Sequence, residues 1–123
     1  MPGTIKIRAG QVEVTATLND TKTAEAIWKA LPITGRVNRW GDEIYFSIRV
    51  KLGSENGTEV VENGDIAYWP PGHAFCIFFG RTPASRGQEI RAASAVNLFG
   101  KVSGDTAALR KVKDGEEIRI EAV

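Results

Sequence analysis

The feature that most constrains the fold of this chain is a repeated alternation of apolar and polar residues in short segments. The alternation covers residues 5–9, 12–17, 44–50 and 118–122, and shorter apolar runs cover 60–61, 66–69, 74–79 and 96–102. A period of two places one side of a strand in the core and the other side in water. Because glycine-containing turn sequences separate many of these runs, the sequence predicts about eight short strands.

Two segments have a helical period instead. Apolar residues between Ala24 and Leu31 recur at helical spacing and end before Pro32, with Asn19 or Asp20 as the expected N-terminal cap,. A second, shorter helix is expected over residues 105–113,. Many strands and only two helices predict a mainly β fold, in the form of a closed eight-stranded β-barrel whose ends the two helices cover.

Length and composition limit the possible classes of protein. The 123 residues suit a single domain, residues 1–123, and the formal net charge of +1 gives no overall attraction to nucleic acid or to an anionic membrane,. Cys76 is the only cysteine, so an internal disulfide is excluded, and no apolar run is long enough to span a bilayer,. A cytoplasmic protein is therefore expected.

The residues that could carry common enzyme chemistry are few. His73 and Cys76 are the only histidine and cysteine, too few for a closed zinc site of about four ligands, so neither a metal nor a cofactor is expected,. The acidic residues Asp42 and Glu43 flank a glycine, where solvated turn carboxylates are common, and are interpreted as turn residues,. The polar segment 81–93 is long enough to suggest a binding loop or a lid.

Several motifs resemble those of the cyclophilins, which are peptidyl-prolyl isomerases. The matching stretches are Thr-Lys-Thr-Ala-Glu-Ala at 21–26, Ala-Phe-Cys-Ile at 74–77 with Arg-Thr at 81–82, and Phe-Gly-Lys-Val at 99–102. The resemblance implies an eight-stranded barrel capped by two helices. Segments 38–46 and 68–72 are similar to a small prokaryotic cyclophilin-like subfamily of uncharacterised function.

The resemblance also implies where an isomerase site would lie. Arg39 takes the place of the arginine in the family's Phe-His-Arg and would stabilise the twisted amide, with Tyr45 beside it as the second catalytic candidate. The family's pocket phenylalanine falls on Cys76 and its pocket histidine at or near Val96, and no tryptophan follows segment 81–83. This comparison places proline binding in the family's orientation in doubt.

The residues themselves allow a different pocket, with aromatic walls and a few polar groups that suit a small ligand or an extended peptide. The candidate ligand-binding residues are Phe46, Trp69, Phe78, Arg81 and Asn97. Alternatively, Phe78 and Phe79 belong to the core and Trp69 packs beneath Pro70 and Pro71.

Three functions remain open. The leading hypothesis is a barrel that binds a peptide or small ligand at an outer aromatic patch without efficient catalysis. The alternatives are a weak peptidyl-prolyl isomerase that uses Arg39, and a structural or interaction module that associates through Trp69 and the adjacent prolines. The expected partner is a proline-containing peptide or a small molecule, a homo-oligomer is left open, and neither nucleic acid nor a membrane is expected.

Overall fold

The structure is a computed structural model that describes residues 3–123. Its strands are β1 (Thr4–Ala9), β2 (Val12–Leu18), β3 (Ile33–Arg36), β4 (Asn38–Arg39), β5 (Glu43–Ser47), β6 (Thr58–Val61), β7 (Asp65–Trp69), β8 (Ala74–Phe78), β9 (Ile90–Val102) and β10 (Glu117–Ala122). The helical segments are the α-helix α1 (Lys22–Ala30) and the 3₁₀ segments η1 (Pro70–Gly72) and η2 (Ala107–Lys111). The chain is therefore mainly β, as the alternation predicts.

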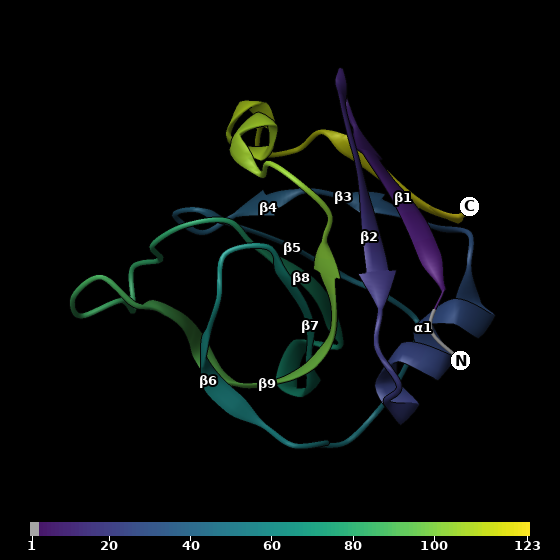
Figure 1. The fold of residues 1–123 in the computed structure, drawn as a ribbon, viewed down its shortest axis with the longest axis horizontal. Helices are drawn as coiled ribbons and strands as arrows, with labels where there is room; N and C mark the ends of the chain where they lie inside the picture. The colour runs from purple at the N-terminus through teal and green to yellow at the C-terminus, as the bar shows by residue number, and fades with distance from the viewer. Residues whose placement is uncertain (1–2) are drawn as a thin grey trace.

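The strands form one strongly curved antiparallel sheet (Figure 1). Its order is β3-β10-β1-β2-β9-β7-β8-β5-β4, and β6 pairs separately with β9. The two ends of this path, β3 and β4, are joined through the chain at Val37, and no hydrogen-bonded ladder between them is found in residues 3–123. The predicted closed eight-stranded barrel is thus corrected to an open sheet with more strands.

The strand period divides the sheet into two apolar faces. On β5, Ile44 and Phe46 point to the inner face and join the main core, while Tyr45 points to the outer face. Strand β8 is buried at every position, as its sequence predicts, because Phe75 and Ile77 face the main core and its other residues face a smaller outer cluster. The outer cluster forms because β6 and the first part of β9 cover this side of the sheet.

Both helical segments lie where apolar periodicity places them, with differences in detail. The cap of α1 is Thr21, whose hydroxyl accepts a hydrogen bond from Ala24 N at 3.0 Å, rather than Asn19 or Asp20. Asn19 instead supports the cap by accepting hydrogen bonds from the amide and hydroxyl of Thr21. The second segment is a 3₁₀ helix, η2, and its Leu109 is buried in the main core.

The strand boundaries differ from the prediction in three places. Segments β3 and β4 are strands that the alternation did not indicate, and β5 ends at Ser47 rather than at Val50. Strand β9 begins at Ile90, so the end of the predicted 81–93 loop belongs to the sheet.

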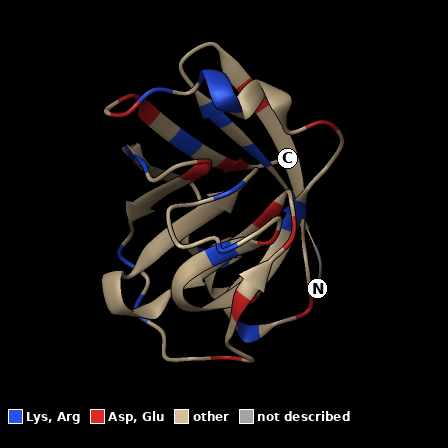
Figure 2. Cartoon of the chain, turned by 90° about the vertical axis from the view of Figure 1, so that its left-hand side faces the viewer, with Lys and Arg blue, Asp and Glu red and all other residues tan. Residues whose placement is uncertain are grey.

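Basic and acidic residues are interspersed along the chain in Figure 2. Within residues 3–123, the structure contains no helix with the length and apolar character needed to cross a membrane.

Candidate functional site

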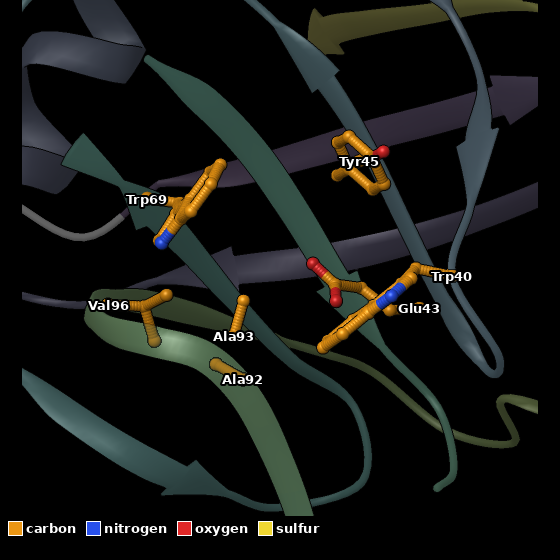
Figure 3. Close-up of a pocket in the computed structure, with 7 residues that line it drawn as sticks. All are labelled: Trp40, Glu43, Tyr45, Trp69, Ala92, Ala93 and Val96. Carbon is orange, nitrogen blue, oxygen red and sulfur yellow. The ribbon is translucent and has the colours of Figure 1, made fainter. Parts of the chain in front are cut away.

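A cavity of about 220 Å³ opens on the outer face of the sheet (Figure 3). Its walls come from the β4–β5 turn, β5, β7 and the first half of β9. The lining residues are Trp40, Glu43, Tyr45, Trp69, Ala92, Ala93 and Val96. Pockets for drug-sized ligands usually have volumes of about 300 to 1,000 Å³, so this one suits a smaller molecule or a single side chain.

The register of the sheet explains why these side chains meet. Glu43 and Tyr45 are two residues apart on β5 and therefore point to the same face,. Tyr45 pairs with Cys76 of β8, which pairs in turn with Ala67 of β7, two residues before Trp69. The outer-face positions of three neighbouring strands thus converge beneath the cavity.

The turn between β4 and β5 places Trp40 at the rim. Trp40 N donates to the carbonyl of Glu43 at 3.0 Å, which closes a tight hairpin connection. Gly41 has a φ of +62° in this turn, a conformation that side chains with a Cβ rarely adopt,. Glycine at this position therefore allows the tight turn, and Figure 3 shows the indole of Trp40 next to the carboxylate of Glu43.

Trp69 is held in one orientation from two sides. Its indole Nε1 donates a hydrogen bond to Ser94 Oγ of β9 at 2.7 Å. On the other side, a Cβ at Gly72 would lie 2.7 Å from Trp69 Cζ3, so glycine is needed for η1 to approach the ring. The tryptophan is a fixed wall of the cavity rather than a freely rotating surface side chain.

Glu43 is the buried ionisable group of this site. The residue is only 6% exposed, and Figure 3 shows its carboxylate between Trp40 and Trp69. Burial raises its pKa to about 7, an effect opposed by a hydrogen bond with the Cys76 thiol,. Burial, followed by the nearby Glu43 charge, raises the pKa of Cys76 well above its ordinary value, so the thiol stays protonated and can donate,.

Arg39 lies on the opposite face of the sheet from this cavity. It pairs with Ile44, whose side chain points into the main core, and its guanidinium lies 5.0 Å from the ring centre of buried Phe79. The guanidinium donates to the carbonyls of Gly41 and Val112 at 3.0 and 2.7 Å. The two predicted catalytic residues, Arg39 and Tyr45, are therefore not brought together in one pocket.

The structure places the predicted ligand-binding residues in different surroundings. Trp69 lines the cavity, whereas Phe46 and Phe78 are buried in the main core and the outer cluster respectively. Arg81 is exposed and donates to the carbonyl of Ser85 at 3.4 Å. The cavity thus unites Trp69 with Tyr45 but not with these three residues.

Asn97, the remaining candidate, connects three parts of the fold. It is 1% exposed, accepts a hydrogen bond from Glu55 N at 2.8 Å, and donates to the Gly53 carbonyl at 2.9 Å and to Thr23 Oγ1 at 3.2 Å. These contacts join β9 to the 53–55 loop and to α1. The hydrogen-bond partners of Asn97 therefore lie outside the cavity, and they connect parts of the fold.

Sequence reasoning missed Glu43 and Trp40 as residues of the site. The interpretation of Glu43 as a solvated turn acid is wrong, because Glu43 is the buried first residue of β5 and shares the face of Tyr45. The sequence does contain a signal for Glu43, because this acidic residue is two positions before Tyr45 and so falls on the same face of the alternating strand. Ala92 and Ala93 were assigned to a loop, and only Val96 was singled out, as the position of the family's histidine.

Comparisons with known proteins agree with this architecture. A sequence model described as cyclophilin-like matches residues 3–121. The chain is also similar to the solution structure of a hypothetical protein from Archaeoglobus fulgidus, with 44% identity, a TM-score of 0.84, and coverage of 98% of this chain and 95% of that one. None of the curated proteins matches the chain. The protein belongs to the cyclophilin-like family.

Proposed function

We propose that the outer cavity binds a small ligand or a single side chain of a peptide, and that the protein does not catalyse prolyl isomerisation efficiently. The observation that carries this proposal is the cavity itself, in which Trp40, Tyr45 and Trp69 surround one buried polar group, Glu43. Concave sites with aromatic walls and few polar groups are the usual form of a small-molecule site.

The position of Arg39 supports the absence of efficient catalysis. An isomerase must stabilise the twisted amide against a barrier of about 18 to 20 kcal/mol, and in the cyclophilin scheme an arginine next to the proline pocket does this. Arg39 contacts Phe79 and backbone carbonyls on the inner side of the sheet. A proline held in the outer cavity would have no guanidinium from Arg39 beside its amide.

Binding can be tested with two probes of suitable size, 3,3-dimethylbutan-1-ol and N-acetylproline methylamide, in an NMR titration. We expect saturable shifts of the methyl signals of Ala92, Ala93 and Val96. Ala93→Phe should remove the shifts by filling the cavity, whereas Ala122→Phe, an exposed substitution on β10, should leave them unchanged. Shifts scattered over the surface in both variants would contradict the proposal.

Catalysis is tested separately with a protease-coupled assay on a series of Xaa-Pro peptides. We expect the wild-type protein to leave the uncatalysed rate unchanged. An acceleration that Ala93→Phe abolishes would show instead that the cavity is an isomerase site.

The interaction-module alternative has less support. Among the described residues, Val60 and Val123 are the large hydrophobic side chains that are clearly exposed, and they do not adjoin Trp69 in sequence. Large interaction surfaces usually contain contiguous apolar patches.

A reducing, cytoplasmic location is part of the ligand-binding proposal and is supported by the single free thiol of Cys76,.

A further inference from the structure

The side chains around the cavity have the composition of a site for an organic cation. Trp40, Tyr45 and Trp69 come from three separate parts of the fold and surround the same space (Figure 3). The faces of aromatic rings carry negative electrostatic potential, and several rings around one space recognise alkylated ammonium groups. Aromatic walls alone would also accept a neutral apolar group, so the polar side chain in the cavity decides between them.

That polar side chain is an acid without a cationic partner in the described residues. Glu43 is 6% exposed, and no ion pair links it to a Lys, Arg or His within residues 3–123. The nearest basic residue in sequence, Arg39, is paired with Asp42 at 3.4 Å and lies on the inner face. Burying a carboxylate without a counter-ion is unfavourable, and a bound cation would remove that cost.

We infer that the cavity binds the methylated ammonium group of an organic cation, with Glu43 as its counter-ion and Trp40, Tyr45 and Trp69 as its walls. This inference rests on the proposed function, because it assigns a ligand class to the same cavity. The volume of about 220 Å³ accommodates a trimethylammonium group with a short substituent. The side chains of β9 that line the cavity, Ala92, Ala93 and Val96, are apolar and favour methyl groups over a hydrated primary ammonium,.

The test compares two molecules of the same shape, choline, which is a cation, and 3,3-dimethylbutan-1-ol, which is neutral. Isothermal titration or NMR titration at about pH 8 should give choline a dissociation constant at least about tenfold lower than that of the alcohol. Equal affinities would overturn the cation assignment while leaving the proposed function intact. Binding of neither molecule would overturn both.

Variants separate the charge from the shape of the site. Glu43→Gln keeps the size of the side chain and removes its charge, so choline binding should weaken by about tenfold or more and binding of the alcohol by much less. Glu117→Gln, an exposed residue on β10, is the matched control and should change neither affinity. An unchanged affinity of Glu43→Gln for choline would overturn the role of this carboxylate.

The dependence on pH gives an independent readout. Among residues 3–123, the titratable groups that face Glu43 are Tyr45 on β5 and Cys76 on β8, and the residues of β7 and β9 that line the cavity are Trp69, Ala92, Ala93 and Val96, which carry no titratable side chain. Because the pKa of Glu43 is about 7, choline should bind more tightly at about pH 8 than at about pH 6, and the alcohol equally at both,. A pH-independent choline affinity would contradict the inference.

The source of the cation is distinguished with a third probe, N-acetyl-trimethyllysine methylamide. Tighter binding of this compound than of choline would assign the site to a modified side chain of a peptide. Tighter binding of choline would assign it to a free small molecule. Failure of both to bind more tightly than the neutral alcohol would overturn the cation assignment.

Discussion

Two glutamates show how strongly the surroundings of a side chain control its charge in this protein. Backbone N–H groups of Arg86 and Gly87 donate to Glu89 and lower its pKa to about 2. Within residues 3–123, Glu43 accepts no such pair of backbone hydrogen bonds, and burial raises its pKa to about 7. Residue type alone therefore does not distinguish a stabilising carboxylate from one that is costly to ionise.

The raised pKa of Glu43 predicts a specific loss of stability with increasing pH. Between the ordinary value of 4.5 and about 7, the folded chain binds a proton at Glu43 that the unfolded chain has released,. Ionisation at higher pH therefore costs the folded state on the order of 3 kcal/mol. Glu43→Gln should match the wild type below about pH 4.5 and exceed its free energy of unfolding by about this amount at pH 8.

Urea unfolding across this pH range measures the difference. The variant Glu117→Gln serves as the control, because it makes the same substitution at an exposed position on β10. A constant difference between Glu43→Gln and the wild type at all pH values would contradict the assignment of a raised pKa.

Gly72 provides a second prediction at the scale of one residue. A Cβ at this position would lie within 2.7 Å of the Trp69 ring, which is too close for a real contact. Gly72→Ala should therefore displace the indole, lengthen its hydrogen bond to Ser94, and weaken binding of 3,3-dimethylbutan-1-ol by several-fold. The Trp69 Nε1–H signal in NMR spectra reports the displacement. Gly53→Ala, where no atom lies within 4 Å of the added Cβ, is the control and should leave that signal in place.

At the scale of elements, Asn97 is expected to stabilise the junction between β9, α1 and the 53–55 loop. Asn97→Ala would leave the Glu55 amide and the Gly53 carbonyl without their side-chain partner in a partly buried place. Unsatisfied buried groups cost about 1 to 3 kcal/mol, so we expect a loss of about 2 to 3 kcal/mol in the free energy of unfolding. Asn38→Ala, on exposed β4, should cost much less.

The same junction predicts a local change that a general loss of packing would not produce. Glu55 accepts hydrogen bonds from the amides of Lys22 and Thr23 and so caps α1 from a distant loop. Without Asn97 to position Glu55, these two amides should exchange hydrogen with solvent faster than they do in the wild type. The exchange rates of amides in β1 should increase less. Uniform exchange throughout the chain in Asn97→Ala would contradict this local role.

The elements that could be predicted from the sequence are those whose period is local. Alternation gives the two faces of β5, and a continuous apolar run gives the burial of β8 on both faces, without knowledge of their neighbours. Strand β3 is different, because Thr34, Gly35 and Arg36 show no alternation and become a strand by pairing with β10, far along the chain. The start of β9 is a similar case, because Ile90 and Arg91 belong to a strand by pairing with Val61 and Val60 of β6, and a bulge interrupts that pairing before Thr58 meets Val96.

At the scale of the whole molecule, alternation defines two faces for each strand but not the way in which the sheet curves. The ends of the sheet, β3 and β4, follow one another along the chain, and β3 pairs with β10 while β4 pairs with β5. This arrangement depends on which distant strands pair, so the sequence supported a curved sheet but could not show that it stays open. The family resemblance predicted a mainly β, cyclophilin-like fold. It did not predict the composition of the pocket, because the cavity side chains differ from the family's residues.

Arg39 connects β4, at one end of this sheet, to residues 112–114 between η2 and β10, which leads to a prediction for the stability of the whole fold. Its guanidinium donates to the carbonyls of Gly41 in the β4–β5 turn and of Val112 after η2, and its amide donates to Asp114 at 2.8 Å. Arg39→Ala should lose about 2 to 4 kcal/mol, because it removes charged hydrogen bonds and the contact with the Phe79 ring,. Arg39→Lys should lose less, since it keeps the charge but not the planar set of donors.

Urea unfolding measures these losses, and Arg119→Ala is the control. Arg119 is exposed and paired with Glu121 at 3.0 Å, so its removal should cost less than about 1 kcal/mol,. Binding of 3,3-dimethylbutan-1-ol to Arg39→Lys should be unchanged, because Arg39 faces away from the cavity. If Arg39→Ala were instead as stable as the wild type while abolishing a measurable isomerase rate, the arginine would be catalytic, and the separation of the two faces of the sheet would not describe its function.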